Sequence, residues 1–357
     1  MTVPDCKKCE TMPLPLPRHG RLYIWPPVAH TGGKIIAEIR KSGHQVVNNL
    51  AVSTLYTDFD IATLPSVMQT LSDTLSPEEM ADTKALIMDS TTEPAVDDIA
   101  RVTSLYAIHA RLGASWLVDV LAESRLRSVF QPIFAASDLT TPFSHECLIR
   151  AVDSQGNIIA PNRLFGAATS ADLVFQLDRA ARAANVRNAH AAGIDNIFIN
   201  FTPSSIYDPN SCLRSTLQII DECGFDRSKV VFEVIETEKI HSTDHLRAIL
   251  KSYRDSGFRV ALDDVGSGYS TLNMLSQLQP DIIKIDRELI DYVDNDIYKQ
   301  AIVSKLIDLA KQIGIEVVAE GVERQAELDF LLYHGVDYIQ GFLLGRPSPT
   351  RFSASNA

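Results

Sequence analysis

Acidic and amide side chains, with one lysine among them, lie at or near the ends of short apolar runs in the second half of this chain. In sequence order they are Glu146 in SHECLIR, Asn200 in IFINF, Glu233 and Glu236 in VVFEVIE, Asp263 and Asp264 in RVALDDVGSG, Lys284 in DIIKID, and Glu320 and Glu323 in EVVAEGVE. At the ends of neighbouring buried strands these groups would converge on one point, where their charge must be neutralised. Carboxylate and amide oxygens are the ligands that Mg²⁺ and Mn²⁺ prefer, and these runs hold no Cys/His cluster of the kind that zinc needs. The pattern predicts bound divalent metal.

Strand periodicity assigns directions to these side chains, because residues two apart share a face. Glu236 faces away from Glu233 or lies in the loop beyond it, so it is a better candidate for holding a loop than for binding metal. Asp263 and Asp264 are adjacent and cannot both point inward along a regular strand, so the pair is expected where the strand ends. Lys284 is expected inside, where nearby carboxylates would keep it charged; a structural ion pair is the alternative.

The apolar runs themselves predict the fold. Eight of them alternate from about Val129 with longer helical patterns such as ADLVFQLDRAARAANVRNAHAAG, which is typical of βα units. The runs are VFQPIF, SHECLIRAV, NIFINF, VVFEVIE, RVALDDV, DIIKID, EVVAEGV and YIQGFLLG. A closed (β/α)8 TIM-type barrel builds its site from the ends of many strands, whereas an open doubly wound sheet uses one switch point. The barrel is therefore preferred, and the open sheet is the alternative.

The first part of the chain predicts a separate small α/β domain. GRLYIWPPVAHTGGKIIAEIRKSGHQVV is typical of a strand, a turn and a helix, and TLPSVMQTLSDTLSPEEMADTKALIM of two helices, the second starting at Ser76 and Pro77. A further helix near ASWLVDVLAESRL would link it to the barrel. We expect a domain at residues 1–115, with a regulatory or interaction role, and the barrel at residues 117–350.

Composition limits the function classes. The 357 residues carry a formal charge of −12, which argues against a broad basic surface for duplex nucleic acid. No apolar run approaches the length of a membrane span, and no stretch of signal-peptide type follows the N-terminus. Five cysteines do not form a disulfide framework, so a cytoplasmic setting is the simpler expectation. Cys6 and Cys9 form a CxxC that is half of a zinc site or an incidental pair.

At these residues the chain resembles the EAL-type cyclic di-GMP phosphodiesterase domain, over roughly Leu117 to Pro349. Eight motifs in the family's order carry the resemblance, among them the signature Glu146-Cys147-Leu148 followed by Arg150. Cys147 replaces the family's alanine; by strand alternation it points away from the site, so we expect little effect on chemistry. The resemblance implies two divalent cations, Mg²⁺ or Mn²⁺, held by Glu146, Asn200, Glu233, Asp263 and Asp264.

The resemblance also implies roles for the remaining residues. Glu320 would be the general base, with Lys284 steadying the nucleophile or the developing charge, and Glu323 and Gln340 would support the second metal and substrate. Glu236 would hold the loop Asp264–Ser270, in which Val265 and Ser267 replace the usual aromatic residue and threonine. The residues that would line the dinucleotide groove are Gln131, Leu148, Arg150 and Pro347. Arg150 can contact a phosphate or form a salt bridge to a barrel carboxylate.

The function expected from this resemblance is metal-dependent hydrolysis of cyclic di-GMP to linear pGpG by a homodimer that associates through the barrel. A catalytically silent cyclic di-GMP receptor that acts through protein partners is the alternative, and a barrel hydrolase for another phosphodiester is a third. Degenerate family members typically lose metal ligands or the base, and this chain keeps them. The presence of the metal ligands and the base therefore favours an enzyme over a silent receptor. No GGDEF-type signature of a diguanylate cyclase precedes the barrel, so synthesis of the messenger is not expected.

Overall fold

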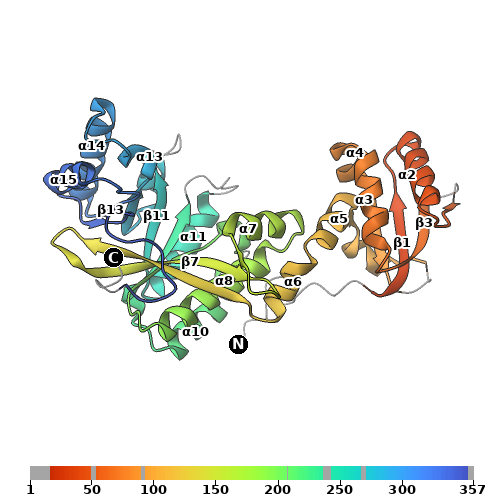
Figure 1. Cartoon of the computed structure of the whole chain (residues 1–357), viewed down its shortest axis with the longest axis horizontal. Coiled ribbons are helices and arrows are strands. Elements are labelled where there is room, and N and C mark those ends of the chain that lie inside the picture. The colour runs from red at the N-terminus through yellow and green to blue at the C-terminus, as the bar shows by residue number, and fades with distance from the viewer. Residues whose placement is uncertain are drawn as a thin grey trace. The chain divides into compact units, whose positions relative to one another are not determined.

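The computed structural model describes residues 17–49, 54–89, 93–206, 208–235, 243–266 and 271–352. The described chain divides into two compact units, drawn in Figure 1. The first unit runs to Ser124 and includes Asn162–Val174; the second contains Arg125–Pro161 and the residues from Phe175 onward. The domain limits expected from the sequence, 1–115 and 117–350, stay a prediction.

The first unit is a five-stranded antiparallel sheet with helices packed on one face. The strand order is β2-β3-β1-β4-β5, with bounds β1 (His19–Trp25), β2 (Val47–Asn49), β3 (Thr54–Asp60), β4 (Lys84–Met88) and β5 (Thr103–Ser104). The helices whose buried residues share the apolar cluster of the sheet are α2 (Ala29–Lys41), α3 (Leu64–Thr74), α4 (Pro77–Asp82) and α5 (Leu105–Gly113). The unit also contains α6 (Ser115–Ala122) and most of α7 (Pro161–Ser170). Leu22 and Ile24 of β1 are fully buried in one apolar cluster with Ile35 of α2 and Leu71 of α3. Alternate residues of β1 thus bind the sheet to its helices.

Two sequence expectations for this unit have different outcomes. Ser76 and Pro77 begin α4 as predicted, because the Ser76 hydroxyl accepts from the Glu79 N–H while the Glu79 carboxylate accepts from the Ser76 N–H. The expectation that the helical pattern continues through KALIM is wrong, since Lys84–Met88 forms strand β4. Pairing of β4 with β1 and β5 outweighs the helix propensity of these residues.

The second unit is the predicted closed barrel. Its ring order is β6-β14-β13-β12-β11-β10-β9-β7, and pairing of β6 with β7 closes it. The strands are β6 (Leu126–Ala135), β7 (Asp138–Val152), β9 (Ile197–Asn200), β10 (Val230–Ile235), β11 (Arg259–Val265), β12 (Ile282–Ile285), β13 (Glu316–Ala319) and β14 (Tyr338–Ile339). All eight overlap the runs predicted from the sequence, with β6 and β7 longer than predicted, and the short β8 (Ile158–Ile159) extends β7 outside the ring. The TIM-type barrel is confirmed.

One strand of the barrel departs from the parallel arrangement expected of βα units. β6 runs antiparallel to both of its neighbours, β7 and β14, while the other ring strands are parallel. Only Ala136 and Ser137 separate β6 from β7, and a connection that short can join antiparallel strands but not parallel ones. Leu126, the first residue of β6, therefore pairs with Ala151 near the end of β7.

Helices lie between the remaining strands and bury the outer face of the ring, as Figure 1 shows for α8, α10, α11 and α14. They are α8 (Val174–Ala191), α9 (Pro209–Cys212), α10 (Arg214–Glu222), α11 (Thr243–Asp255), α12 (Thr271–Leu278), α13 (Arg287–Ile290), α14 (Ile297–Ile313) and α15 (Gln325–His334). Their apolar sides and the outward strand residues form one large core that includes Phe232, Tyr253 and Ile307. In the described ranges, no helix combines the length and apolar character needed to cross a bilayer.

Some residues singled out in the sequence lie outside the described ranges. They are Cys6 and Cys9, Glu236, and Ser267 to Ser270 of the loop after β11. Their expected roles stay predictions.

His145 is a buried titratable group at the amino-terminal end of the barrel. It lies on β7, its side chain is nearly inaccessible, and its Nε2 accepts a 3.4 Å hydrogen bond from the Phe352 N–H. Burial lowers the pKa of His145 to about 4, and Arg351 contributes to the same shift. The folded protein therefore binds this proton less readily than the unfolded chain does.

We expect His145 to make the protein less stable as pH falls. Its pKa is lower in the folded state, so its stabilising contribution is present above pH 6.5 and is lost as pH decreases toward 4. This group alone should lower the free energy of unfolding by about 2 kcal/mol between pH 7 and pH 5. Urea unfolding of wild type and His145→Gln at both pH values measures the difference. His190→Gln, an exposed histidine, is the control, and equal pH dependence in all three proteins would contradict the prediction.

Candidate active site

An apolar layer inside the barrel fixes the height of the site. Six buried side chains from six strands form this layer, which we call the barrel floor: Ile133, Phe198, Val231, Ala261, Ile282 and Val318. Residues two positions further along a strand point to the same side. In the five parallel strands those positions are Asn200, Glu233, Asp263, Lys284 and Glu320. In the reversed β6 the corresponding position is two residues earlier, at Gln131. The predicted site residues thus form the next layer, toward the carboxyl ends of the parallel strands.

Lys284 lies at the centre of this layer. Its ammonium nitrogen is 2.5 Å from Glu320 Oε1, 2.8 Å from Glu233 Oε1, 3.2 Å from Asp263 Oδ1 and 3.6 Å from Glu146 Oε2. The lysine side chain is only 1% exposed. Burial alone would lower the pKa of Lys284, but the four carboxylates raise it well above its usual value, so the group stays charged. The predicted inward lysine is present, paired with four partners.

The charge at this point is unbalanced. With Asp264, five carboxyl groups surround one ammonium, which leaves four negative charges uncompensated if every group is ionised. Burial raises the pKa values of Glu233, Asp263 and Glu320 above their usual range, and the charge of Lys284, which lowers them, only partly offsets this effect. Further positive charge is needed for all these groups to ionise near neutral pH.

Glu146 differs from the other carboxyl groups because two amides stabilise its charge. Asn200 Nδ2 donates to Glu146 Oε1 at 3.0 Å, and Gln340 Nε2 donates to Oε2 at 2.8 Å. Burial raises the pKa of Glu146, but Lys284 and these two hydrogen bonds outweigh it and hold the pKa below its usual value. Glu146 therefore remains a carboxylate, and Gln340 is hydrogen-bonded into the cluster; its predicted support of the second metal and substrate stays a prediction.

A β-bulge brings both members of the acidic pair to the site. The pairing of β11 with β12 shifts between Leu262 and Val265, so Asp263 and Asp264 lie where the strand is irregular. Asp264 takes a left-handed backbone with φ of 56°, and its N–H donates to Asp263 Oδ1 at 3.0 Å. Burial, with the charge of Asp263, raises the pKa of Asp264 to about 6. Two adjacent carboxylates thus share one site, which a regular strand would not allow.

The donor set fits divalent cations. One oxygen each of Asp263, Asp264 and Glu320 lie within 4.8 Å of one another, a spacing that one cation can bridge. Glu233 is fully buried; Lys284 Nζ lies 2.8 Å from its Oε1, whereas its Oε2 accepts no hydrogen bond from the described residues. Gln340 Oε1 is buried and likewise accepts none. Unpaired buried oxygens are costly, and the all-oxygen set is what hard cations such as Mg²⁺ and Mn²⁺ prefer.

The predicted groove residues lie on the strands that flank Glu146. Gln131 of β6 pairs with Glu146 across the β6–β7 hairpin, and its Nε2 lies 3.5 Å from the Gly345 carbonyl. Leu148 and Arg150 follow Glu146 on β7 and are half-buried, as is Pro347 after β14. The Arg150 guanidinium donates to the Ile149 carbonyl at 2.8 Å and forms no ion pair with a described carboxylate. The alternative of a barrel salt bridge for Arg150 therefore finds no support in the described residues.

Glu323 lies in a second polar group beside the site. Its carboxylate pairs with Arg287 at 3.1 Å, and its N–H donates to Glu327 at 3.0 Å. Glu327 was not predicted from the sequence; it is buried and also accepts from the N–H groups of Tyr292 and Arg324, at 2.9 and 3.0 Å. Glu327 thereby holds the segment that follows Glu320. Its place at the third position of α15 is the signal that could have found it, since a glutamate there often caps the helix start.

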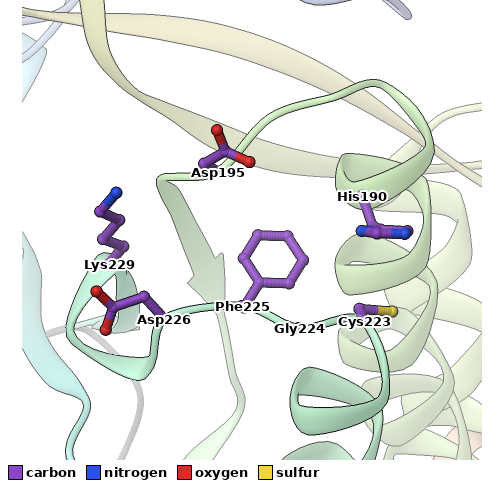
Figure 2. Close-up of a pocket in the computed structure, with 7 residues that line it drawn as sticks. All are labelled: His190, Asp195, Cys223, Gly224, Phe225, Asp226 and Lys229. Atoms are coloured by element: carbon purple, nitrogen blue, oxygen red, sulfur yellow. The ribbon is translucent and has the colours of Figure 1, made fainter.

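A pocket on the same unit lies elsewhere. Figure 2 shows it lined by His190, Asp195, Phe225 and Lys229, together with Cys223, Gly224 and Asp226. Asp195 precedes β9 and Lys229 precedes β10, so the pocket is at the amino-terminal ends of these strands. Active sites of such barrels lie at the opposite end. This pocket is therefore separate from the acidic layer.

Comparison with known proteins matches the same region. The family model of the EAL domain matches residues 114–347. The cyclic di-GMP phosphodiesterase PdeL of Escherichia coli is 31% identical over 224 residues, which cover 61% of this chain and 61% of PdeL. The bifunctional diguanylate cyclase/cyclic di-GMP phosphodiesterase MucR of Pseudomonas aeruginosa is 32% identical over 216 residues, 57% of this chain and 30% of MucR. The chain thus spans less than two thirds of the length of either relative.

Solved structures agree on the fold. The phosphodiesterase of PaMucR in complex with c-di-GMP has a TM-score of 0.58 at 28% identity and covers 65% of this chain and 96% of that one. A standalone EAL protein from Vibrio cholerae O395 in its c-di-GMP-bound form has a TM-score of 0.58 at 30% identity, with coverage of 64% and 94%.

Removing the central ammonium should destabilise the protein when no metal is bound. Lys284→Met keeps the length of the side chain but leaves buried carboxylates facing one another, so we expect a loss of about 3–5 kcal/mol in the free energy of unfolding at pH 7. Lowering the pH to 5 should recover part of the loss, because protonation removes the repulsion. Urea unfolding in EDTA measures both effects.

Lys305→Met is the matched control for this change, because Lys305 pairs with Asp308 at the surface and is 80% exposed. That substitution should cost less than about 1 kcal/mol. Equal losses for the two variants would contradict a central role for Lys284.

Proposed function

Because this chain belongs to the EAL domain family, we propose that it is a phosphodiesterase that hydrolyses cyclic di-GMP to linear pGpG with the help of divalent metal. The observation that carries the proposal is the meeting of Glu146, Glu233, Asp263 and Glu320 around Lys284 in one layer of the barrel. The names of relatives such as PdeL, and the c-di-GMP bound to similar structures, support this substrate.

Two divalent cations, Mg²⁺ or Mn²⁺, would be held by the oxygens already gathered here. We assign them to Glu146, Asn200, Glu233, Asp263 and Asp264. The cations would supply the positive charge that acidifies the attacking water and stabilises the phosphoryl oxygens. Their four positive charges would match the four negative charges that the site leaves uncompensated.

Glu320 is proposed to accept the proton of the attacking water. Burial raises its pKa, and the nearby Lys284 opposes that shift, so its basicity is set by the same cluster that binds metal. Lys284 contributes a fixed positive charge beside the reacting atoms. Water attacks phosphorus, the new P–O bond forms, and the P–O3′ bond breaks, with the proton ending on the 3′ oxygen. One of the two phosphodiester bonds is thereby opened.

The groove residues are proposed to hold the dinucleotide. Arg150 offers a guanidinium to a phosphate, since no described carboxylate pairs with it. Gln131, Leu148 and Pro347 would contact the rest of the ligand. Gln340 and Glu323 would support the metal-side contacts, and Glu236 would hold the loop after β11.

We propose further that the protein is a homodimer formed through the barrel and that the N-terminal unit regulates it. Three apolar side chains of α14 support the dimer because they are exposed in the single chain: Ile297 at 71%, Tyr298 at 76% and Ile302 at 47%. Activity and association that are unchanged in a chain beginning near Leu117 would count against regulation by the N-terminal unit.

Hydrolysis with defined variants tests the main proposal. Purified protein with Mg²⁺ or Mn²⁺ should convert cyclic di-GMP to pGpG, and EDTA should abolish the reaction. Glu320→Gln should lower kcat by about 10²-fold or more, because a general base is lost. Glu146→Gln should lower it through weaker metal binding. Product formation is followed by chromatography.

Glu316→Gln is the matched control. Glu316 is the first residue of β13 and pairs with Arg259, whereas Glu320 directly follows the last residue of that strand. It should retain near wild-type kcat. Binding of cyclic di-GMP without cleavage in the presence of either metal would overturn the proposal of an enzyme and favour the silent receptor. Cleavage of other phosphodiesters in preference to cyclic di-GMP would overturn the substrate.

Dimerisation is tested by sedimentation of Ile302→Glu. A charge in the centre of a buried apolar contact is costly, so the variant should shift to monomer while the wild type sediments as a dimer. A wild type that remains monomeric at micromolar concentration would contradict the dimer.

A further inference from the structure

A buried ion pair on helix α8 lies outside the acidic layer. Asp178 and Arg182 are one helical turn apart, with Arg182 Nη2 2.9 Å from Asp178 Oδ2, and the two side chains are 3% and 2% exposed. Removing two charges from water is unfavourable, and a buried pair of this kind is weak evidence for stability. Neither residue was predicted from the sequence, although an aspartate and an arginine four residues apart among the alanines of LDRAARAA are a visible signal.

The pair is fully engaged with the loop that follows β9. Asp178 Oδ1 accepts from the Thr202 N–H at 2.8 Å, and Oδ2 accepts from the Ser205 hydroxyl at 2.7 Å and from Arg182 Nε at 3.0 Å. Arg182 in turn donates to the Thr216 hydroxyl of α10 at 2.8 Å. Two groups of the loop are thus fixed to α8 through the Asp178 carboxylate, and one group of α10 is fixed to it through Arg182.

This loop begins directly after a site residue. Asn200 is the last residue of β9, two positions before Thr202, and its amide donates to Glu146 at 3.0 Å. The short 3-10 helix η2 (Pro203–Ser205) then turns the chain away, with the Ser205 hydroxyl shared between Asp178 and the Thr202 carbonyl. A metal ligand must be held to within a few tenths of an ångström, so the backbone on the far side of Asn200 needs a fixed attachment. Asp178 provides one.

We propose that Asp178 is a positioning residue that acts through Ser205 and the Thr202 N–H to hold Asn200 in place for divalent metal. The inference rests on the proposed function, since it takes Asn200 as a metal ligand. The ion pair with Arg182 orients the carboxylate, and the hydroxyl of Thr216 accepts a hydrogen bond that fixes Arg182. Partners that orient metal ligands in this way typically change metal affinity by about 10–100-fold when they are removed.

The test compares Ser205→Ala with Ser204→Ala in the full chain. Ser205 is buried and donates to Asp178, whereas its neighbour Ser204 is exposed. Titration of the metal-free proteins with Mn²⁺ alone should show a dissociation constant about 10-fold weaker for Ser205→Ala and within about 2-fold of wild type for Ser204→Ala. With cyclic di-GMP at saturating Mn²⁺, Ser205→Ala should lose kcat with little change in KM. Asp178→Asn, which keeps the shape but removes the charge, should show a larger loss of Mn²⁺ affinity.

A purely structural role would give a different result. It would lower the melting temperature of Ser205→Ala while leaving the Mn²⁺ affinity of the folded protein equal to that of Ser204→Ala, and that outcome overturns the inference alone. Wild type that fails to bind Mn²⁺ would overturn the proposed metal site together with it. The Ser205 comparison decides the matter even if Asp178→Asn does not fold.

Discussion

The mouth of this barrel depends on one buried ammonium group. Lys284 reaches four carboxylates that come from four other strands, β7, β10 and β11 and the end of β13, and it is the one cation among the described residues that does so. Without it, the buried carboxylates would repel one another, and they would separate or bind protons instead of metal. With it, the layer is still negative, and burial together with the neighbouring carboxylates raises the pKa values of Glu233, Asp263 and Glu320. The cluster is therefore stable enough to form and acidic enough to take up cations.

The apolar floor beneath this layer gives the charged groups their common height. Phe198, Val231 and Val318 fill the barrel interior, and each lies two residues before a polar group. Because the floor excludes water from below, the carboxylates face solvent and ligands only from the mouth. Burial above this apolar floor raises the pKa values of Glu233, Asp263 and Glu320 and strengthens the attraction of the carboxylates to cations. The apolar side chains that pack the barrel and the polar side chains of the site are therefore successive layers on the same strands.

Much of this arrangement could be predicted from the sequence because it follows strand periodicity. The eight strands, the inward lysine and the irregular strand end at Asp263 and Asp264 all come from alternation and chain breaks that are visible in the residues. Features that depend on contacts distant in sequence could not be read in this way. The apolar run of β6 does not indicate that the strand is antiparallel to its neighbours. KALIM forms a strand because it pairs with neighbouring strands. Glu327 accepts hydrogen bonds from N–H groups of other segments, which the local sequence does not indicate. The metal ligands and groove roles themselves remain proposals that hydrolysis and binding measurements decide.

The antiparallel β6 has a consequence for where the chain enters the barrel. In a barrel of parallel strands throughout, the polypeptide would join the ring at the end remote from the catalytic rim. Here the pairing of Leu126 with Ala151 means that the incoming chain meets the ring at the rim itself, on the strand that carries Gln131 beside Glu146. The reversed strand thus places the first residue of the ring at the same end of the barrel as the acidic layer.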